Sequence, residues 1–194
     1  MGSRRDALTA ASEMILGVER AAASERDLVA TVGRAKILPG ATNVIPGQVE
    51  FTIDMRGPED AVRRRAHTAL LADLRRIAKQ RGVGIDIDTF QENPAVALDA
   101  GVADAVGEAI AACGHEPLRL PSGAGHDAGI MAKHCPSGMI FVRCKDGISH
   151  NPAESITVAE ADLGVRALLE AVRRLDRWLG EAKGGQTPRA CRRV

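Results

Sequence analysis

The chain has 194 residues, 45% of them hydrophobic and 26% charged, and its 26 Lys and Arg against 25 Asp and Glu leave a formal net charge of +1. This composition excludes a disordered or fibrous protein and predicts one large or two small globular domains. The near-zero charge and the 2% aromatic content also argue against binding to nucleic acid or to an anionic membrane, so we expect neither as a partner.

The amino-terminal residues do not resemble a targeting signal. Arg4 and Arg5 precede an apolar stretch, but Asp6 and Glu13 interrupt it, and no apolar run approaches the roughly 18 residues of a membrane span. We therefore expect a cytoplasmic protein. The cysteines show no Cys-x-x-Cys spacing, which favours reduced structural thiols over disulfides or a cysteine zinc site. They are Cys113, Cys135, Cys144 and Cys191.

The first half of the chain predicts a small α+β sandwich with helices on one face of a sheet. Its expected elements are a helix over 4–23, strands over 28–37 and 49–55, a helix from about Pro58 that stops at Gly82, and a strand over 83–89. The second strand has the clearest pattern, because apolar Val49, Phe51 and Ile53 alternate with polar neighbours. Such a period of two predicts a half-buried strand whose other face carries the charges.

Beyond Pro94 the pattern changes to helices alternating with short apolar strands, which predicts an α/β layer. The expected elements are a helix over 99–113, a strand over 117–120, a helix ending near 134, a strand over 139–142 and a helix over 158–179. An apolar strand needs cover on both faces, and two strands cannot make such a sheet alone. We expect residues 184–194 to be a loose basic tail.

Two histidines occupy turn-rich loops at the ends of these short apolar runs. Residues 122–128 read Ser-Gly-Ala-Gly-His-Asp-Ala, and residues 147–154 read Gly-Ile-Ser-His-Asn-Pro-Ala-Glu. A loop held by a rigid scaffold can present His126 or His150 to a pocket rather than bury it. No other cluster of His, Asp and Glu in the sequence could complete a metal centre, so these loops predict part of a site.

Two further motifs precede these loops: Asn-Val-Ile-Pro-Gly at 43–47, and a strand that ends in Asp-Met-Arg at 54–56. In order and spacing, the four motifs resemble the dinuclear metal amidohydrolases. Specifically, the chain resembles the group of allantoate amidohydrolases, N-carbamoyl-L-amino acid hydrolases and β-ureidopropionases, within the aminoacylase and carboxypeptidase superfamily. The resemblance runs from about residue 4 to about residue 180.

The resemblance implies a fold and an assembly. Enzymes of this group have an α/β/α catalytic domain interrupted by a smaller lid, or dimerisation, domain. Residues 1–91 resemble the lid, an α+β domain with two helices on an antiparallel sheet, and residues 95–183 resemble the closing part of the catalytic domain. The resemblance therefore implies a homodimer formed through the lid. It also implies a small substrate with a carboxylate: allantoate, an N-carbamoyl-L-amino acid or N-carbamoyl-β-alanine.

The resemblance also implies roles for individual residues. His150 resembles a ligand of one of two divalent metal ions, which in this family are zinc, manganese, cobalt or nickel. Gly125 and His126 resemble the pair that contacts the substrate, with His126 stabilising the transition-state oxygen as a catalytic residue. Asn43 and Arg56 resemble the lid residues that grip the substrate carboxylate, for which a planar guanidinium is suited.

The two histidine motifs contain further acidic residues, but the chain lacks the other metal-binding motifs of the family. Asp127 and Glu154 are expected to support the loops. The upstream His, Asp and Glu motifs of the family, which supply the other metal ligands and the general base, are absent from the 194 residues. One histidine cannot hold two metal ions, because a catalytic metal needs about three protein ligands. We therefore expect the chain to be inactive alone.

Two other readings remain open. Residues 123–128 also satisfy Gly-x-Gly-x-x-Ala, a nucleotide-binding pattern, and Asp146 follows the next predicted strand. Pro121 in the turn and the shortness of the preceding strand argue against it. The second alternative is a non-catalytic protein: a module that dimerises through the lid, or a truncated remnant.

Overall fold

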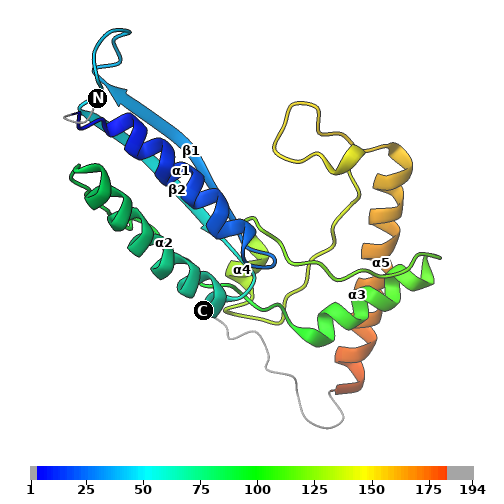
Figure 1. The fold of residues 1–194 in the computed structure, drawn as a ribbon. Coiled ribbons are helices and arrows are strands. Elements are labelled where there is room, and N and C mark those ends of the chain that lie inside the picture. The colour runs from blue at the N-terminus through cyan, green and yellow to red at the C-terminus, as the bar shows by residue number, and fades with distance from the viewer. Residues whose placement is uncertain (1–3, 183–194) are drawn as a thin grey trace. The chain divides into compact units, whose positions relative to one another are not determined.

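A computed structural model describes residues 4–182 (Figure 1). The chain divides into two compact units, unit 1 at Met1–Ala95 and unit 2 at Val96–Val194. The basic tail expected at 184–194 lies outside the described residues. Among residues 4–182, every helix is too short or too polar to span a lipid bilayer.

Unit 1 has the order helix, strand, strand, helix. Its elements are α1 (Ala7–Ala23), β1 (Val29–Leu38), β2 (Gln48–Arg56) and α2 (Asp60–Arg81). β1 and β2 form an antiparallel hairpin in which Val29 pairs with Arg56 at one end and Leu38 with Gln48 at the other. The two helices and the first two strands predicted for this region are therefore present. α1 begins later than Arg4 because the Asp6 carboxylate caps it, accepting from the Leu8 and Thr9 backbone N–H groups at 2.9 and 3.1 Å.

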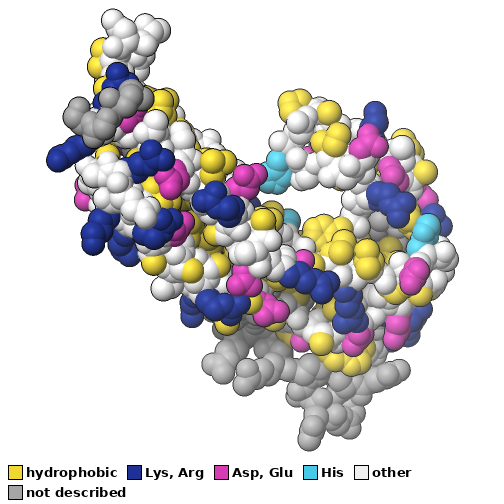
Figure 2. Space-filling model, viewed as in Figure 1, with side chains coloured by type: hydrophobic (Ala, Val, Ile, Leu, Met, Phe, Trp, Pro, Cys, Tyr) yellow, Lys and Arg dark blue, Asp and Glu magenta, His cyan; other side chains and the backbone are white. Residues whose placement is uncertain are grey.

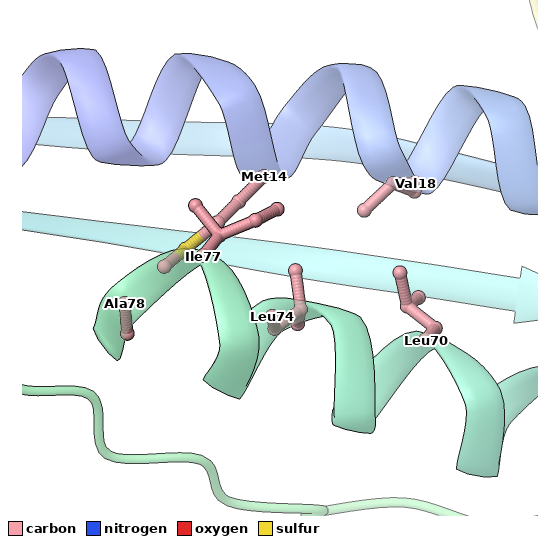
Figure 3. Packing of buried hydrophobic residues seen from close by; sticks show 6 residues of the cluster. All are labelled: Met14, Val18, Leu70, Leu74, Ile77 and Ala78. Atoms are coloured by element: carbon pink, nitrogen blue, oxygen red, sulfur yellow. The ribbon is translucent and has the colours of Figure 1, made fainter. Parts of the chain in front are cut away.

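The core of unit 1 lies between the two helices and one face of the hairpin. Figure 3 shows side chains of α1 and α2 pointing into the space between the helices. Alternate strand residues, including Val32, Phe51 and Ile53, pack against this cluster. The alternation seen in the sequence therefore reflects one buried and one exposed sheet face, as predicted. The buried cluster consists of Met14, Val18, Leu70, Leu74, Ile77 and Ala78.

The strand expected over 83–89 does not form, and the sheet of the described residues contains only β1 and β2. α2 ends at Gly82, which has a left-handed φ of 64°, as predicted. Val83 and Ile85 then pack against the core without pairing to a strand edge. Burial of alternate apolar side chains explains the alternation in this segment, whereas a strand also needs hydrogen bonds to the backbone of a neighbouring strand.

Unit 2 is built on two packed helices. Its elements are α3 (Ala100–Ala112), α4 (Asp127–Met131), a 3-10 turn η1 (Lys145–Gly147) and α5 (Val158–Ala182). α3 packs on α5, and small side chains on both helices are buried: Ala109 on α3 and Ala167 and Ala171 on α5. Gly114, at φ 84°, follows the end of α3, as predicted. The helix expected to end near 134 is shorter, because α4 ends at Met131 and turns follow it.

The strands expected over 117–120 and 139–142 are also absent from the described part of unit 2. Both segments leave large apolar side chains exposed, among them Leu118 at 75% and Phe141 at 52%. A strand is stabilised by its neighbours, and residues 4–182 offer these segments none. Figure 2 shows hydrophobic side chains gathered on the visible face of unit 2, whereas on unit 1 basic and acidic side chains intermix.

Candidate functional site

The loop before α4 presents His126 on the surface of unit 2. His126 is the residue before the first turn of α4, and its side chain is exposed. Its Nε2 lies 2.6 Å from Ser122 Oγ, and its ring meets the Phe141 ring edge-on, with centroids 6.2 Å apart. Gly125 is exposed, and a Cβ added there would meet no atom within 4 Å apart from those of its two chain neighbours. The backbone at Gly125 is thus open to a ligand, and the imidazole is restrained beside it.

The second loop presents His150. The His150 side chain is exposed, and its backbone has a left-handed φ of 56°, which is uncommon for a residue other than glycine. The Glu154 carboxylate accepts from the His150 backbone N–H at 3.0 Å, and Asn151 Oδ1 accepts from the Ala153 N–H at 2.9 Å. These bonds hold the loop in place, which is the role expected for Glu154. Asp127 is the first residue of α4, where a carboxylate suits the helix dipole.

The two histidine loops do not form a metal centre by themselves. Among residues 4–182 there is no group of three or more His, Cys, Asp and Glu side chains placed to hold a metal ion. Within the second loop, the Glu154 carboxylate accepts from the His150 backbone N–H. The described residues therefore do not fit a divalent cation, which needs about three protein ligands in a catalytic site.

Asn43 and Arg56 lie in unit 1, at opposite ends of the hairpin. Asn43 is exposed in the loop that joins β1 to β2, and Arg56 is the last residue of β2, a strand of nine residues. At about 3.3 Å per residue, β2 alone separates the two positions by roughly 26 Å. The structure does not bring these two predicted carboxylate-binding residues together on one hairpin.

Arg56 is held by Asp54, two residues earlier on the same exposed face of β2. Arg56 Nε donates to Asp54 Oδ1 at 2.9 Å, and Nη2 lies 2.5 Å from Oδ2. The hydrogen bonds from the guanidinium lower the pKa of Asp54 below its ordinary value, and burial opposes this. The same bonds raise the pKa of Arg56. The carboxylate thus fixes the guanidinium plane near neutral pH.

This pair predicts a pH-dependent contact. Because the pKa of Asp54 is lowered on folding, the stabilisation is complete above the ordinary carboxylate pKa and is lost as the pH falls through the lowered pKa. Replacing Arg56 with alanine should raise the pKa of Asp54 toward its ordinary value, measured by a ¹³C NMR titration of the carboxyl carbon. Arg34→Ala, on the same sheet face, is the control and should leave it unchanged. An Asp54 titration that Arg56→Ala does not move would contradict the pairing.

Sequence reasoning missed three side chains that shape these sites: Ser122, Phe141 and Asp54. Ser122 belongs to the motif over 122–128, and its position four residues before His126 could have indicated the contact. Asp54 and Arg56 are two apart on a strand, which places them on one face. No sequence pattern indicated the role of Phe141, because its ring contacts His126 from a segment that is distant in the sequence. The described cysteines, Cys113, Cys135 and Cys144, are free thiols, as expected.

The fold and the motif loops agree with a family match over most of the chain. Residues 5–174 match the model of peptidase family M20/M25/M40, and the chain belongs to this family. It is similar to the N-carbamoyl-L-amino acid amidohydrolase of Geobacillus stearothermophilus, with 39% identity over 172 residues, which are 89% of this chain and 42% of the relative. It is also similar to the allantoate amidohydrolase of Escherichia coli, with 38% identity over 87% of this chain and 41% of that one.

A solved structure gives the same result. The crystal structure of an amidase of the hydantoinase/carbamoylase family from Burkholderia multivorans superposes with a TM-score of 0.85 and 39% identity, covering 91% of this chain and 43% of that one. The kinship inferred from the four motifs is therefore confirmed. The chain spans about two fifths of the length of the relatives it matches.

Proposed function

We propose that the chain forms part of a hydrolase that cleaves a linear C–N bond of an N-carbamoyl amino acid or of allantoate. The observation that carries this proposal is that relatives named for these two activities align with 89% and 87% of the chain. The four motifs, taken in order, support it independently. The nucleotide-binding alternative loses its basis, since no strand precedes the Gly-x-Gly-x-x-Ala segment among the described residues.

In this proposal His126 and Gly125 contact the reacting part of the substrate. The exposed imidazole, restrained by Ser122 and Phe141, donates a hydrogen bond to the oxygen that gains negative charge in the transition state. The open backbone at Gly125 lets the substrate approach closely, since among the described residues only its two chain neighbours come within 4 Å of a Cβ added there.

Arg56 and Asn43 bind the substrate carboxylate. The planar guanidinium can bind a carboxylate in the bidentate manner that it uses toward Asp54. An N-carbamoyl amino acid is far shorter than the roughly 26 Å of β2. We therefore assign the two residues to different copies of the chain, in a homodimer formed through unit 1 as the lid.

His150 contributes one ligand to a divalent-metal site whose other ligands come from outside the described residues. Its exposed imidazole and hydrogen-bonded loop support this role, because the loop holds the backbone from which the ring can reach an ion. The family resemblance indicates zinc, manganese, cobalt or nickel. Unit 2 supplies the closing part of an α/β/α catalytic domain, and the exposed apolar segments 117–120 and 139–142 support this, since they lack neighbours.

Complementation tests the proposed function. The full chain alone, with added metal, should not hydrolyse N-carbamoyl-L-amino acids or allantoate. The same chain co-expressed with the part of the Geobacillus stearothermophilus relative that it does not match should release product, measured as ammonia or free amino acid. Light scattering then measures whether the active species is a dimer.

The control is the same co-expression with His150→Ala, which should abolish hydrolysis and reduce the bound metal measured by elemental analysis. Hydrolysis by the chain alone would overturn the expectation of dependence on a partner. A stable complex without activity on either substrate would favour the non-catalytic dimerising module.

A further inference from the structure

The Ser122 hydroxyl is close enough to His126 to decide where the imidazole carries its proton. The Oγ–Nε2 distance is 2.6 Å. This contact also fixes which way the ring faces: a ring carbon would sit at about 3.3–3.6 Å from an oxygen, so only a nitrogen fits at this distance. Nε2 is therefore the atom that Ser122 contacts.

The hydroxyl is itself held in place by the loop. The Ala124 backbone N–H donates to Ser122 Oγ at 3.2 Å, which occupies one of its lone pairs. The hydroxyl proton then has two acceptors within reach, His126 Nε2 at 2.6 Å and the Ala124 carbonyl at 3.4 Å. Donation to Nε2 gives the hydroxyl the shorter bond, whereas accepting from an Nε2–H would leave the hydroxyl proton only the Ala124 carbonyl at 3.4 Å, so the distances favour donation to Nε2. A neutral imidazole that accepts at Nε2 carries its proton on Nδ1.

The other side of the ring is restrained by packing. The Phe141 ring meets the imidazole edge-on at an interplanar angle of 74°. No hydrogen bond involves Nδ1 among the described residues, whereas Nε2 is occupied by Ser122. The Nδ1–H group is thus the donor that the exposed ring can offer to a ligand.

We propose that Ser122 is a positioning residue that holds neutral His126 in the tautomer with its proton on Nδ1, so that Nδ1–H is the donor to the substrate oxygen. The second half of this statement rests on the proposed function, while the tautomer does not. A donor that must stabilise a developing oxyanion works best when its proton is already in place and aimed. Without Ser122 the ring would be free to exchange tautomers and to rotate.

A nucleophilic role for Ser122 is the competing explanation of the same contact. In that arrangement the histidine takes the serine proton, and a third group, usually a carboxylate, hydrogen-bonds the far ring nitrogen. No described carboxylate bonds Nδ1 of His126. The geometry therefore supports positioning of the imidazole rather than attack by the serine.

The test reads the tautomer directly in the full chain, with no need for activity. ¹⁵N-labelled histidine is observed by NMR at a pH of about 8, where an ordinary imidazole is neutral. In the wild type, His126 should show a protonated Nδ1 and an unprotonated Nε2. Ser122→Ala should move the population toward Nε2–H, and Ser122→Thr, which keeps the hydroxyl, should restore the wild-type pattern. Ser149→Ala, which removes a hydroxyl beside His150, is the matched control and should leave His126 unchanged.

Activity of the complemented enzyme gives a second readout. Ser122→Ala should lower kcat about tenfold, the effect of one ordinary hydrogen bond, with little change in KM, and Ser122→Thr should retain it. A wild-type His126 protonated on Nε2, or a Ser122→Ala spectrum equal to the wild type, would overturn the proposal. If the complemented wild-type chain hydrolyses neither substrate, the proposed function fails while the tautomer assignment stands; if His126→Ala leaves hydrolysis intact, the role of Nδ1–H as donor to the substrate oxygen fails.

Discussion

Replacing His126 with alanine is expected to lower kcat of the complemented enzyme by roughly 100- to 1,000-fold, the usual loss when one donor to a developing oxyanion is removed. The expectation follows from an exposed imidazole that is fixed by Ser122 on one nitrogen and by Phe141 on its ring. Steady-state kinetics on an N-carbamoyl-L-amino acid measure kcat and KM separately. KM should change less than kcat, because the bond strengthens in the transition state.

His115→Ala is the matched control for this experiment. His115 is also an exposed histidine of unit 2, but it lies outside the motif loops, three residues after the end of α3. Its replacement should leave kcat within about twofold of the wild type, as expected for a surface position away from any site. If His126→Ala costs no more than His115→Ala, the His126 imidazole does not contact the reacting oxygen.

Replacing Ile77 with alanine is expected to lower the free energy of unfolding of unit 1 by about 2–5 kcal/mol, the usual range for Ile→Ala in a core. Ile77 is completely buried, with 0% of its side chain exposed, and packs with Met14 and Leu74 between α1 and α2 (Figure 3). The cost combines lost burial with the cavity left behind. Urea unfolding followed by far-ultraviolet circular dichroism measures it.

Leu16→Ala is the matched control, because Leu16 lies on α1 but is 52% exposed. It should change the free energy of unfolding by about 0.5 kcal/mol or less. The single tryptophan, Trp178, lies on α5 of unit 2, so its fluorescence follows that unit separately. An Ile77→Ala protein that is as stable as Leu16→Ala would show that the core is not where the structure places it.

Local pattern was sufficient for the elements of unit 1 that bury one face. Alternation from Val49 to Met55 predicted β2, and helical spacing predicted α1 and α2, because these signals record which side chains leave water. Gly82 marked the end of α2, because few other residues adopt a left-handed φ readily. These outcomes depend on the chain within a few residues of each position.

The same reasoning failed for 83–89, 117–120 and 139–142, where apolar runs were taken as strands. An extended apolar segment becomes a strand only when another strand's backbone groups lie beside it, and the segment's own residues cannot supply them. Residues 83–89 pack partly on the core, and 117–120 and 139–142 remain exposed.

For the candidate site, the residue pattern was enough to place His126 and His150 in exposed, turn-rich loops and Asn43 and Arg56 on the hairpin, because Gly, Pro and Asn impose turns locally. The atoms that meet one another are known only from the folded chain. The Ser122–His126 bond, the Phe141 contact and the separation of Asn43 from Arg56 along β2 depend on side-chain directions and on the length of a folded strand. These are properties of three-dimensional packing, and individual contacts of this kind cannot be deduced from residue types and their order.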